Sequence, residues 1–218
     1  MGKLKTGVLI SGRGSNLQAL IDACSQPEFP AEISLVISNK ADAYGLVHAS
    51  DAGIPTVTIN HQDFASREAF DRAVDEALRD ADIEFLCLAG FMRILSDEFV
   101  QIWQDRLINI HPSLLPAFKG LDTHRRAIDA GVRIAGCTVH FVRPALDDGP
   151  IIMQAAVPVL ADDTPDTLAE RIITQEHLCY PQALRMIAEG RVTVAGDKAL
   201  ITDTDSIGDF ANQALISP

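Results

Sequence analysis

The chain has 218 residues, of which 47% are apolar and 22% are charged. This composition is typical of a globular protein, and a chain of this length can bury about 70% of its unfolded surface. The 18 basic and 30 acidic residues give a formal net charge of −12, which speaks against nucleic acid or an anionic membrane as a partner. An anionic small molecule would have to bind where backbone amides and a few arginines concentrate positive potential.

The sequence lacks the signals of membrane, secreted and metal-binding proteins. A transmembrane helix needs an apolar run of about 18 residues, which is absent, and no apolar signal-peptide core follows Met1. We therefore expect a cytoplasmic protein with no membrane partner. None of the cysteines, Cys24, Cys87, Cys137 and Cys179, has C-x-x-C or zinc-type spacing. We expect them to be reduced and structural, and we expect no metal site.

Short apolar runs alternate with amphipathic segments over the first half of the chain. The apolar runs predict strands at 6–10, 33–37, 55–59, 84–88 and 107–110. Helical spacing of apolar residues predicts helices from about Leu17 to Cys24, over 41–52 and over 66–81, the last capped by Ser66. Strands that are apolar on both faces and alternate with helices predict a single-domain, doubly wound, mostly parallel sheet of the α/β class.

The pattern changes after residue 111. The stretch 111–124 has no apolar period and is expected to form a long loop, of the kind that is usually functional or mobile. Strands at 137–142 and 150–157, joined by PALDDG, predict an antiparallel C-terminal portion, and a helix follows at 167–188. We expect residues 1–190 to form the catalytic domain and 191–218 to form a β-finish and tail of that domain.

A glycine-containing loop, Ser11-Gly12-Arg13-Gly14-Ser15-Asn16, joins the first strand to the first helix. Glycines allow a tight turn and close approach of a ligand, and the helix N-terminus attracts anions. The loop lacks the Gly-Lys-Ser/Thr of a Walker loop and the third glycine of a dinucleotide fingerprint, and it does not match a nucleophile elbow. It predicts a phosphate site, although a tight turn without a ligand remains an alternative.

Two further segments bring together residue types that are suited to catalysis. Alternation along the fifth strand places Asn109 and His111 on one face, at the carboxyl end where parallel sheets bind ligands. A turn, Leu146-Asp147-Asp148-Gly149-Pro150, offers a carboxylate that would orient a histidine or stabilise its cationic form. A structural histidine and an ordinary turn are the alternatives, and spacing alone does not choose between Asp147 and Asp148. His140, in an apolar strand, is expected to be a satisfied core residue.

Taken together, these segments resemble the folate-dependent phosphoribosylglycinamide formyltransferase family, which has a Rossmann-like fold. The resemblance spans roughly residues 6–190 and rests on segments that occur in the same order. They are VLISGRGSNLQ, SNKADAYGL, LAGFMRIL, INIHPSLLPAFKGLDTH, GCTVHFV, LDDGPII and QEHxxYP, where x marks positions outside the match. About the last 25 residues carry none of it.

The resemblance implies that the formyl group of 10-formyltetrahydrofolate is transferred to the amino group of glycinamide ribonucleotide, in purine biosynthesis and without a metal. Asn109, His111 and Asp147 match the family's catalytic residues; the D-x-G-P frame points to Asp147 as the working carboxylate. Gly14, Ser15, Asn16 and Glu176 match its ribonucleotide contacts. The folate contacts are matched by Arg67, Met92, Arg93, Ile94, Leu95, Arg143, Pro144, Ala145 and Leu146.

Other functions remain as alternatives. Methionyl-tRNA formyltransferases and formyltetrahydrofolate hydrolases share the same three catalytic residue types, but they carry additional domains, so we expect this chain to be the single catalytic domain. A phosphate-ligand sensor on the same sheet would use the glycine loop and leave Asn109 and His111 idle. A nicotinamide oxidoreductase is disfavoured by the missing fingerprint. Both a monomer and a homodimer are compatible with the sequence.

Overall fold

The computed structural model describes residues 2–202, and seven strands within this range form one sheet in the order β3-β2-β1-β4-β5-β6-β7. Strands β1 to β5 are parallel, whereas β6 and β7 run antiparallel to their neighbours. Their bounds are β1 (Leu4–Ile10), β2 (Ala31–Ser38), β3 (Thr56–Thr58), β4 (Phe85–Leu88), β5 (Leu107–His111), β6 (Ile134–Phe141) and β7 (Ile151–Pro158). The predicted α/β class, mostly parallel sheet and antiparallel C-terminal portion are confirmed.

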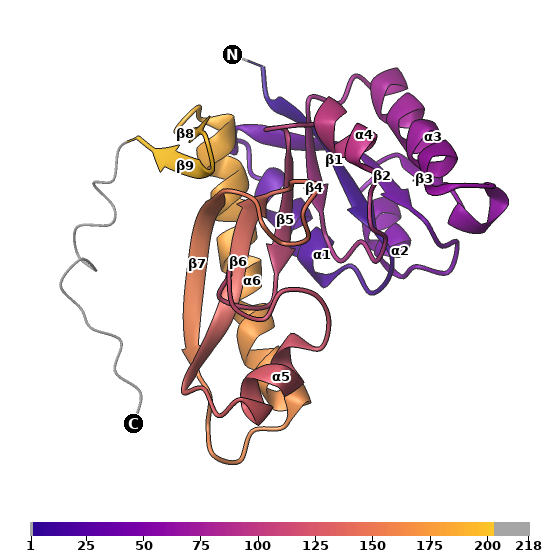
Figure 1. Cartoon of the computed structure of the whole chain (residues 1–218). Coiled ribbons are helices and arrows are strands. Elements are labelled where there is room, and N and C mark those ends of the chain that lie inside the picture. The colour runs from indigo at the N-terminus through magenta and orange to yellow at the C-terminus, as the bar shows by residue number, and fades with distance from the viewer. Residues whose placement is uncertain (1, 203–218) are drawn as a thin grey trace.

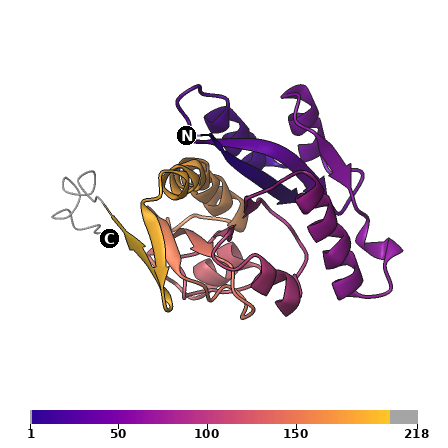
Figure 2. The same cartoon turned by 90° about the horizontal axis from the view of Figure 1, so that it is seen from above.

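Helices pack on both faces of this sheet (Figures 1 and 2). They are α1 (Ser15–Cys24), α2 (Gly45–Asp51), α3 (Arg67–Asp80), α4 (Asp97–Ile102), α5 (Thr123–Asp129) and α6 (Pro165–Ala188), with a short 3₁₀ segment at His61–Asp63. Successive side chains of β1 point to opposite faces of the sheet. Val8 and Ile10 lie in the core that includes α1 and α6, whereas Leu9 lies in the core that includes α3 and α4. Two cores therefore flank one sheet, which explains why its strands are apolar without alternation.

Several expected boundaries were wrong. The helix expected over 41–52 begins only at Gly45, because a turn between Lys40 and Ala43 precedes it. The six-residue α4 was missed, since it is too short to show an apolar period; the Ser96 hydroxyl caps it by accepting from the backbone N–H of Phe99. Helix α5 begins at Thr123, inside the stretch that was expected to be loop. The cap of α3 by Ser66 is confirmed.

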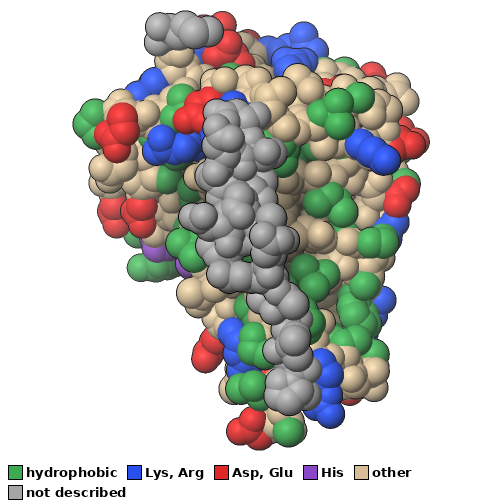
Figure 3. All heavy atoms as spheres, turned by 90° about the vertical axis from the view of Figure 1, so that its left-hand side faces the viewer, with side chains coloured by type: hydrophobic (Ala, Val, Ile, Leu, Met, Phe, Trp, Pro, Cys, Tyr) green, Lys and Arg blue, Asp and Glu red, His purple; other side chains and the backbone are tan. Residues whose placement is uncertain are grey.

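A small hairpin ends the described part of the chain. Strands β8 (Val192–Ala195) and β9 (Lys198–Ile201) pair with each other, and β9 lies near β7. The hairpin lies within residues 191–218, which were expected to form a β-finish and tail, and residues 203–218 of that range lie outside the described residues. On the side of the molecule that carries β7, hydrophobic side chains are interspersed with basic and acidic ones (Figure 3). Within residues 2–202, no helix has the length and apolar character needed to cross a membrane.

Tyr180 joins α6 to the two strands at the centre of the sheet. Its side chain is fully buried, and its hydroxyl donates towards the carbonyl oxygens of Leu88 (2.9 Å) and Ile108 (3.3 Å), on β4 and β5. A buried phenol needs such partners, because a polar group without them is costly to bury. The hydroxyl therefore fixes α6 relative to strands that also carry residues of the site described below.

We expect Tyr180→Phe to lower the free energy of unfolding by about 1–2 kcal/mol, since one buried hydrogen bond contributes about 0.5–1.5 kcal/mol and its loss leaves a carbonyl unsatisfied. Urea denaturation followed by circular dichroism measures the change. Tyr44→Phe is the matched control, because Tyr44 is 59% exposed. A surface change of this kind should stay within about 0.5 kcal/mol. Equal effects of the two substitutions would contradict the role given to the Tyr180 hydroxyl.

Candidate active site

The order in which the strands are added reverses at β1, so the carboxyl ends of β1 and β4 form the topological switch point of the sheet. From β1 the chain passes through α1 to β2 on one side, and after β3 and α3 it returns to β4 on the other side. The segments that follow β1 and β4 therefore diverge from neighbouring strand ends. In open α/β sheets, ligands bind at such a switch point. Strand β5, beside β4, ends in the Asn109-Ile110-His111 segment.

The structure places His111 next to Asp147, and Asn109 and Asp147 both lie beside His140. Nδ1 of His111 lies 3.5 Å from Oδ2 of Asp147, which is an ion-pair distance longer than a normal hydrogen bond. Their side chains are only 8% and 10% exposed. The Nε2 atom of His111 lies 3.0 Å from the carbonyl oxygen of Phe118. Both ring nitrogens thus face oxygen atoms, and because a carbonyl oxygen can only accept, Nε2–H donates to Phe118.

Asp147 is held in place by the backbone of the 112–124 segment, whereas Asp148 pairs with a different residue. Oδ2 of Asp147 accepts from the backbone N–H of Gly120 at 2.8 Å, and the residue has a left-handed φ of 48°. Asp148 instead pairs with Lys119. Gly149 is required next to them, because a Cβ there would lie 1.7 Å from the carbonyl oxygen of Phe141. The structure therefore places Asp147, and not Asp148, against the histidine.

His140 belongs to this cluster, although the sequence suggested only a core residue. Strand pairing sets it opposite Asn109, and its Nε2 lies 3.4 Å from Nδ2 of Asn109 and 3.9 Å from Oδ1 of Asp147. Its Nδ1 lies 2.9 Å from the carbonyl oxygen of Phe141, so Nδ1 carries the proton and neutral Nε2 accepts from Asn109. Burial lowers the pKa of His140 and favours this neutral form. Only the register of β5 with β6 reveals this role, and the sequence does not give that register.

A cavity of about 140 Å³ opens beside these residues. Of the predicted folate contacts it is lined by Arg93, Ile94, Leu95, Arg143, Pro144 and Leu146, and Asn109, His140 and Asp147 complete its polar part. Its other lining residues are apolar: Leu88, Phe91, Val100 and Val142. The sequence predicts none of these four as a contact, because apolar residues of this kind look like ordinary core in a sequence. The cavity can hold a flat apolar group next to a carboxylate, an imidazole and an amide.

Three predicted folate contacts, Arg67, Met92 and Ala145, are not among the residues that line this cavity. Arg67 is exposed in the first turn of α3. Ala145 is exposed between two lining residues. The side chain of Met92 is 66% exposed, while its backbone N–H donates to the Ser11 hydroxyl at 2.8 Å.

The glycine loop forms a second polar centre. Gly14 has φ 79° and packs so closely on Gly45 that a Cβ on Gly14 would lie 2.5 Å from the Gly45 Cα. Asn16, in the first turn of α1, donates from Nδ2 to Oε2 of Glu176 on α6 at 2.7 Å. Both side chains are buried, and within residues 2–202 the Oδ1 atom of Asn16 has no hydrogen-bond partner.

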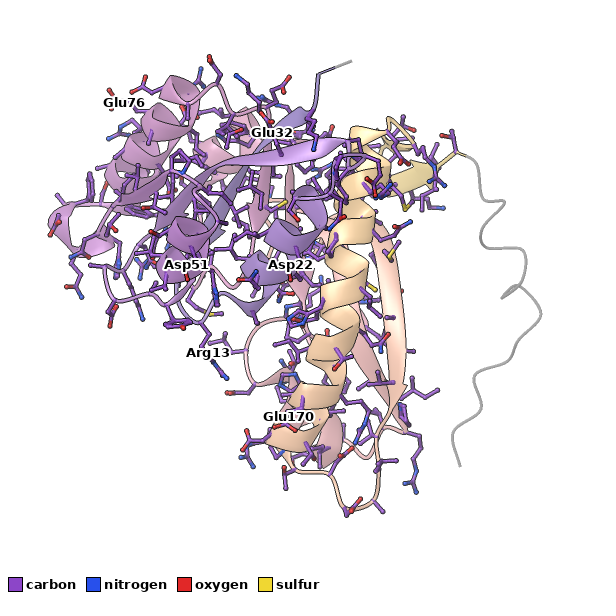
Figure 4. All side chains as sticks on the ribbon, turned by 180° about the vertical axis from the view of Figure 1, so that it is seen from behind. Arg13, Asp22, Glu32, Asp51, Glu76 and Glu170 are labelled. Carbon is purple, nitrogen blue, oxygen red and sulfur yellow. The ribbon has the colours of Figure 1, made fainter. Side chains whose placement is uncertain are left out.

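In this second centre, burial disfavours the charged form of Glu176 and the hydrogen bond from Asn16 favours it. Burial raises the pKa of Glu176, while the hydrogen bond from Asn16 opposes that shift. Ser15 begins α1 beside Gly14, so its backbone N–H belongs to the helix N-terminus, where the dipole favours an anion. Arg13, on the same loop, projects away from the body of the protein (Figure 4).

The described residues do not include a cluster of side chains that could bind a metal ion. Among residues 2–202 there is no group of three or more His, Cys, Asp or Glu side chains placed to hold a metal ion. The four cysteines are free; Cys87, Cys137 and Cys179 are buried and Cys24 is half-buried. Burial raises the pKa of the Cys24 thiol to about 12, which keeps it protonated and unreactive.

Residues 4–184 match the family model for formyl transferases. The chain is 50% identical over 188 residues to the phosphoribosylglycinamide formyltransferase of Escherichia coli K12, and the match covers 85% of this chain and 87% of that protein. The glycinamide ribonucleotide transformylase 1 structure from Symbiobacterium toebii superposes with a TM-score of 0.90 at 47% identity. That superposition covers 92% of this chain and 95% of the other.

A longer relative shares the same segment. The trifunctional purine biosynthetic protein adenosine-3 of Gallus gallus is 53% identical over 192 residues, which is 88% of this chain. The chain spans only 19% of the length of that protein. The matched segment contains both polar centres described above, with the glycine loop at its start and Glu176 near its end. The chain therefore belongs to the formyl transferase family, and within it to the phosphoribosylglycinamide formyltransferases.

Proposed function

We propose that the chain transfers the formyl group of 10-formyltetrahydrofolate to the amino group of glycinamide ribonucleotide, in purine biosynthesis. The products are formylglycinamide ribonucleotide and tetrahydrofolate. The observation that carries this proposal is a cavity lined by Asn109, Asp147 and most predicted folate contacts, in which Asp147 lies against His111. The names and high coverage of the relatives support the same reaction.

The two polar centres suit the two substrates. The folate ring system would enter the cavity lined by Arg93, Leu95 and Arg143, and Arg67 with Met92 would contact its exposed end. The ribonucleotide phosphate would lie at the N-terminus of α1, against Gly14, Ser15 and Asn16. Its ribose hydroxyls would then be donors for the buried Glu176 carboxylate and for Oδ1 of Asn16. The remaining folate contacts in this proposal are Ile94, Pro144, Ala145 and Leu146.

The reaction begins when the substrate amine attacks the formyl carbon and the carbonyl π electrons move onto oxygen. Asn109 has one Nδ2 hydrogen directed to His140 and a second that can stabilise the oxyanion. A proton then passes from the new ammonium nitrogen to N10 of the folate, directly or through water. The C–N10 bond breaks with its electron pair on N10, and the carbonyl re-forms as formylglycinamide.

In this proposal, the positive charge of a protonated His111 stabilises the oxyanion, and Asp147 stabilises that positive charge. With both ring nitrogens facing acceptors, a protonated His111 is satisfied in the free protein. Donation to the oxyanion requires Nε2–H to leave the Phe118 carbonyl, so the 112–124 segment has to yield when substrate arrives. Asp147 stays beside Nδ1, held by the Gly120 amide, and keeps the imidazolium favourable.

We further propose that the protein works in the cytoplasm as a monomer or homodimer, with small-molecule substrates and no metal or nucleic acid. The net charge of −12 supports the absence of a nucleic-acid partner. The direct test of the reaction is to mix the protein with both substrates and follow the folate absorbance change on formyl loss. Absence of transfer at saturating substrate would contradict the proposed function.

We expect Asp147→Asn to lower kcat by about 10²-fold or more, because the imidazolium of His111 loses the charge that stabilises it. Asp148→Asn is the matched control, since Asp148 only pairs with Lys119 at the surface. An exposed ion pair contributes about 0–1 kcal/mol, so the control should stay within about fivefold. Steady-state kinetics with both substrates measure the difference. Similar losses in the two variants would show that the carboxylate was assigned wrongly.

We expect His111→Ala and Asn109→Ala each to reduce kcat by about 10²–10³-fold, as for the loss of a donor to an oxyanion. Ribonucleotide affinity should change little, because neither side chain belongs to the glycine-loop centre. Calorimetric titration of the ribonucleotide gives the affinity, and single-turnover formyl transfer gives the chemical step. Near-normal turnover by His111→Ala would remove the histidine from the mechanism.

We expect Glu176→Gln to raise KM for the ribonucleotide by about tenfold, since a charged acceptor is lost and such hydrogen bonds contribute about 1.5–3 kcal/mol. Because the pKa of Glu176 is raised, the unsubstituted protein should lose affinity on acidification at a higher pH than an ordinary glutamate would cause. Ribonucleotide KM across the pH range measures both effects. The two proteins should converge at low pH, where Glu176 is protonated. Glu170→Gln, an exposed position on the same helix (Figure 4), should leave the profile unchanged.

A further inference from the structure

The hydroxyl of Ser11 lies where three segments meet near the switch point of the sheet. Ser11 follows β1 directly and is 4% exposed. Its Oγ lies 2.6 Å from Oδ1 of Asn39, which follows β2. It also accepts from the backbone N–H of Met92, beyond β4, at 2.8 Å. One side chain from the glycine loop therefore contacts the backbone of the segment that carries the proposed folate contacts 92–95.

The direction of each of these hydrogen bonds is determined by the donors available. A serine hydroxyl has a single hydrogen, and the Met92 amide can only donate. The hydroxyl therefore donates to Oδ1 of Asn39 and accepts from Met92. The amide nitrogen of Asn39 is then free to donate to Nδ1 of His61, which lies 3.1 Å away. If the Asn39 amide were flipped, its Nδ2 would face the Ser11 hydroxyl in place of Oδ1. The hydroxyl would then face two donors, Nδ2 of Asn39 and the Met92 amide, and its hydrogen would lose this acceptor.

The 92–95 segment is fixed at both of its ends by buried side chains. At its start the Met92 amide donates to Ser11, and just beyond its end the Ser96 amide donates to Oδ2 of Asp71 at 2.6 Å. Phe91, immediately before the segment, stacks on Phe70 of α3 with ring centroids 6.4 Å apart. The Asp71 bond fixes the end that continues into α4, and Ser11 fixes the end nearest the glycine loop.

The glycine loop has supports that do not involve the Ser11 hydroxyl. The backbone N–H of Gly45 donates to the carbonyl oxygen of Gly12 at 3.0 Å, and Gly14 packs directly on Gly45. Asn16 is held by Glu176. Loss of the hydroxyl would therefore release the folate-side segment more than the ribonucleotide-side loop. This asymmetry distinguishes a positioning role from general destabilisation.

We propose that Ser11 is a positioning residue for the folate site, supplied by the ribonucleotide-binding loop. The proposal rests on the proposed function, because it takes the 92–95 segment to contact the formyl donor. Ser11 touches neither substrate in this scheme and acts through the Met92 amide. Its hydroxyl fixes the backbone of Met92, the first residue of the segment. It thereby sets how far Arg93 and Ile94 lie from Asn109, which lines the same cavity.

The test is Ser11→Ala, assayed for KM of each substrate, for kcat, and for tetrahydrofolate affinity by calorimetric titration. We expect KM for 10-formyltetrahydrofolate and the Kd of tetrahydrofolate to rise by about fivefold to tenfold, the range expected for one lost hydrogen bond of about 1–1.4 kcal/mol. The ribonucleotide KM should stay within about twofold, an energy near the 0.5 kcal/mol limit of neutral changes. Ser11→Thr keeps the hydroxyl and should bind folate more tightly than Ser11→Ala.

Ser38→Ala is the matched control. Ser38 is also fully buried at the end of a neighbouring strand, and its hydroxyl makes two hydrogen bonds, both to the backbone of Lys40. It makes none to the 92–95 segment, so its loss should reduce thermal stability without the folate-specific effect. Comparison of the two variants therefore separates the lost contact to Met92 from the general cost of a missing buried hydroxyl.

Three results would overturn the inference: equal losses for both substrates in Ser11→Ala, folate affinity within twofold of normal, or the same folate-specific loss in Ser38→Ala. Failure of the proposed function looks different, because the unsubstituted protein itself would then transfer no formyl group from the folate to the ribonucleotide. That result would remove the inference together with the function it rests on. Normal turnover of the unsubstituted protein combined with any of the three results would contradict the inference alone.

Discussion

The contact between His111 and Asp147 is the constraint on which the rest of the site depends. The histidine ends a parallel strand, and the aspartate stands in a turn that follows an antiparallel one, so only the reversal from β5 into β6 brings them together. The same reversal sets His140 opposite Asn109. If β6 were parallel to β5, its last residues would lie at the same edge of the sheet as His111. The turn between β6 and β7, which carries Asp147, would then not fold back over His111.

Electrostatics at the site work against the charge of the whole protein. Both proposed substrates are anions, and a chain with a net charge of −12 repels them at long range. Attraction must therefore be local. It can come from the N-terminus of α1 and from the arginines that line the cavity, of which Arg143 is already paired with Asp105 at 2.5 Å. Arg93 is exposed at the cavity and lies next to the backbone that Ser11 holds.

The parts of the fold that the sequence predicts are those in which one local property dominates. Both-faced apolar runs predict β1, β2 and β4, and the Ser66 cap with its apolar stripe predicts α3. Helix α4 was not predicted because six residues are too few to show the apolar period of a helix. Its position also depends on Asp71 of α3, which lies 25 residues away in the sequence. The role of His140 was not predicted because its pairing with Asn109 is set by the register of β5 with β6, which depends on tertiary packing. Spacing alone did not choose between Asp147 and Asp148; the D-x-G-P frame pointed to Asp147, and the path of the turn places that residue against His111.

The site carries strain that the rest of the chain must offset. Phe118, Asp122 and Asp147 all have positive φ, between 48° and 55°, and all lie in the two segments that close over His111. Each left-handed non-glycine residue costs about 1 kcal/mol or more, and a buried acceptor without a partner, such as Oδ1 of Asn16, costs about 1–3 kcal/mol. The compensation lies in the two apolar cores and in anchors such as Tyr180. Positive φ also occurs away from the site, at Asp82 and Asp105, but the three residues near His111 shape the turns that bring Asp147 against it.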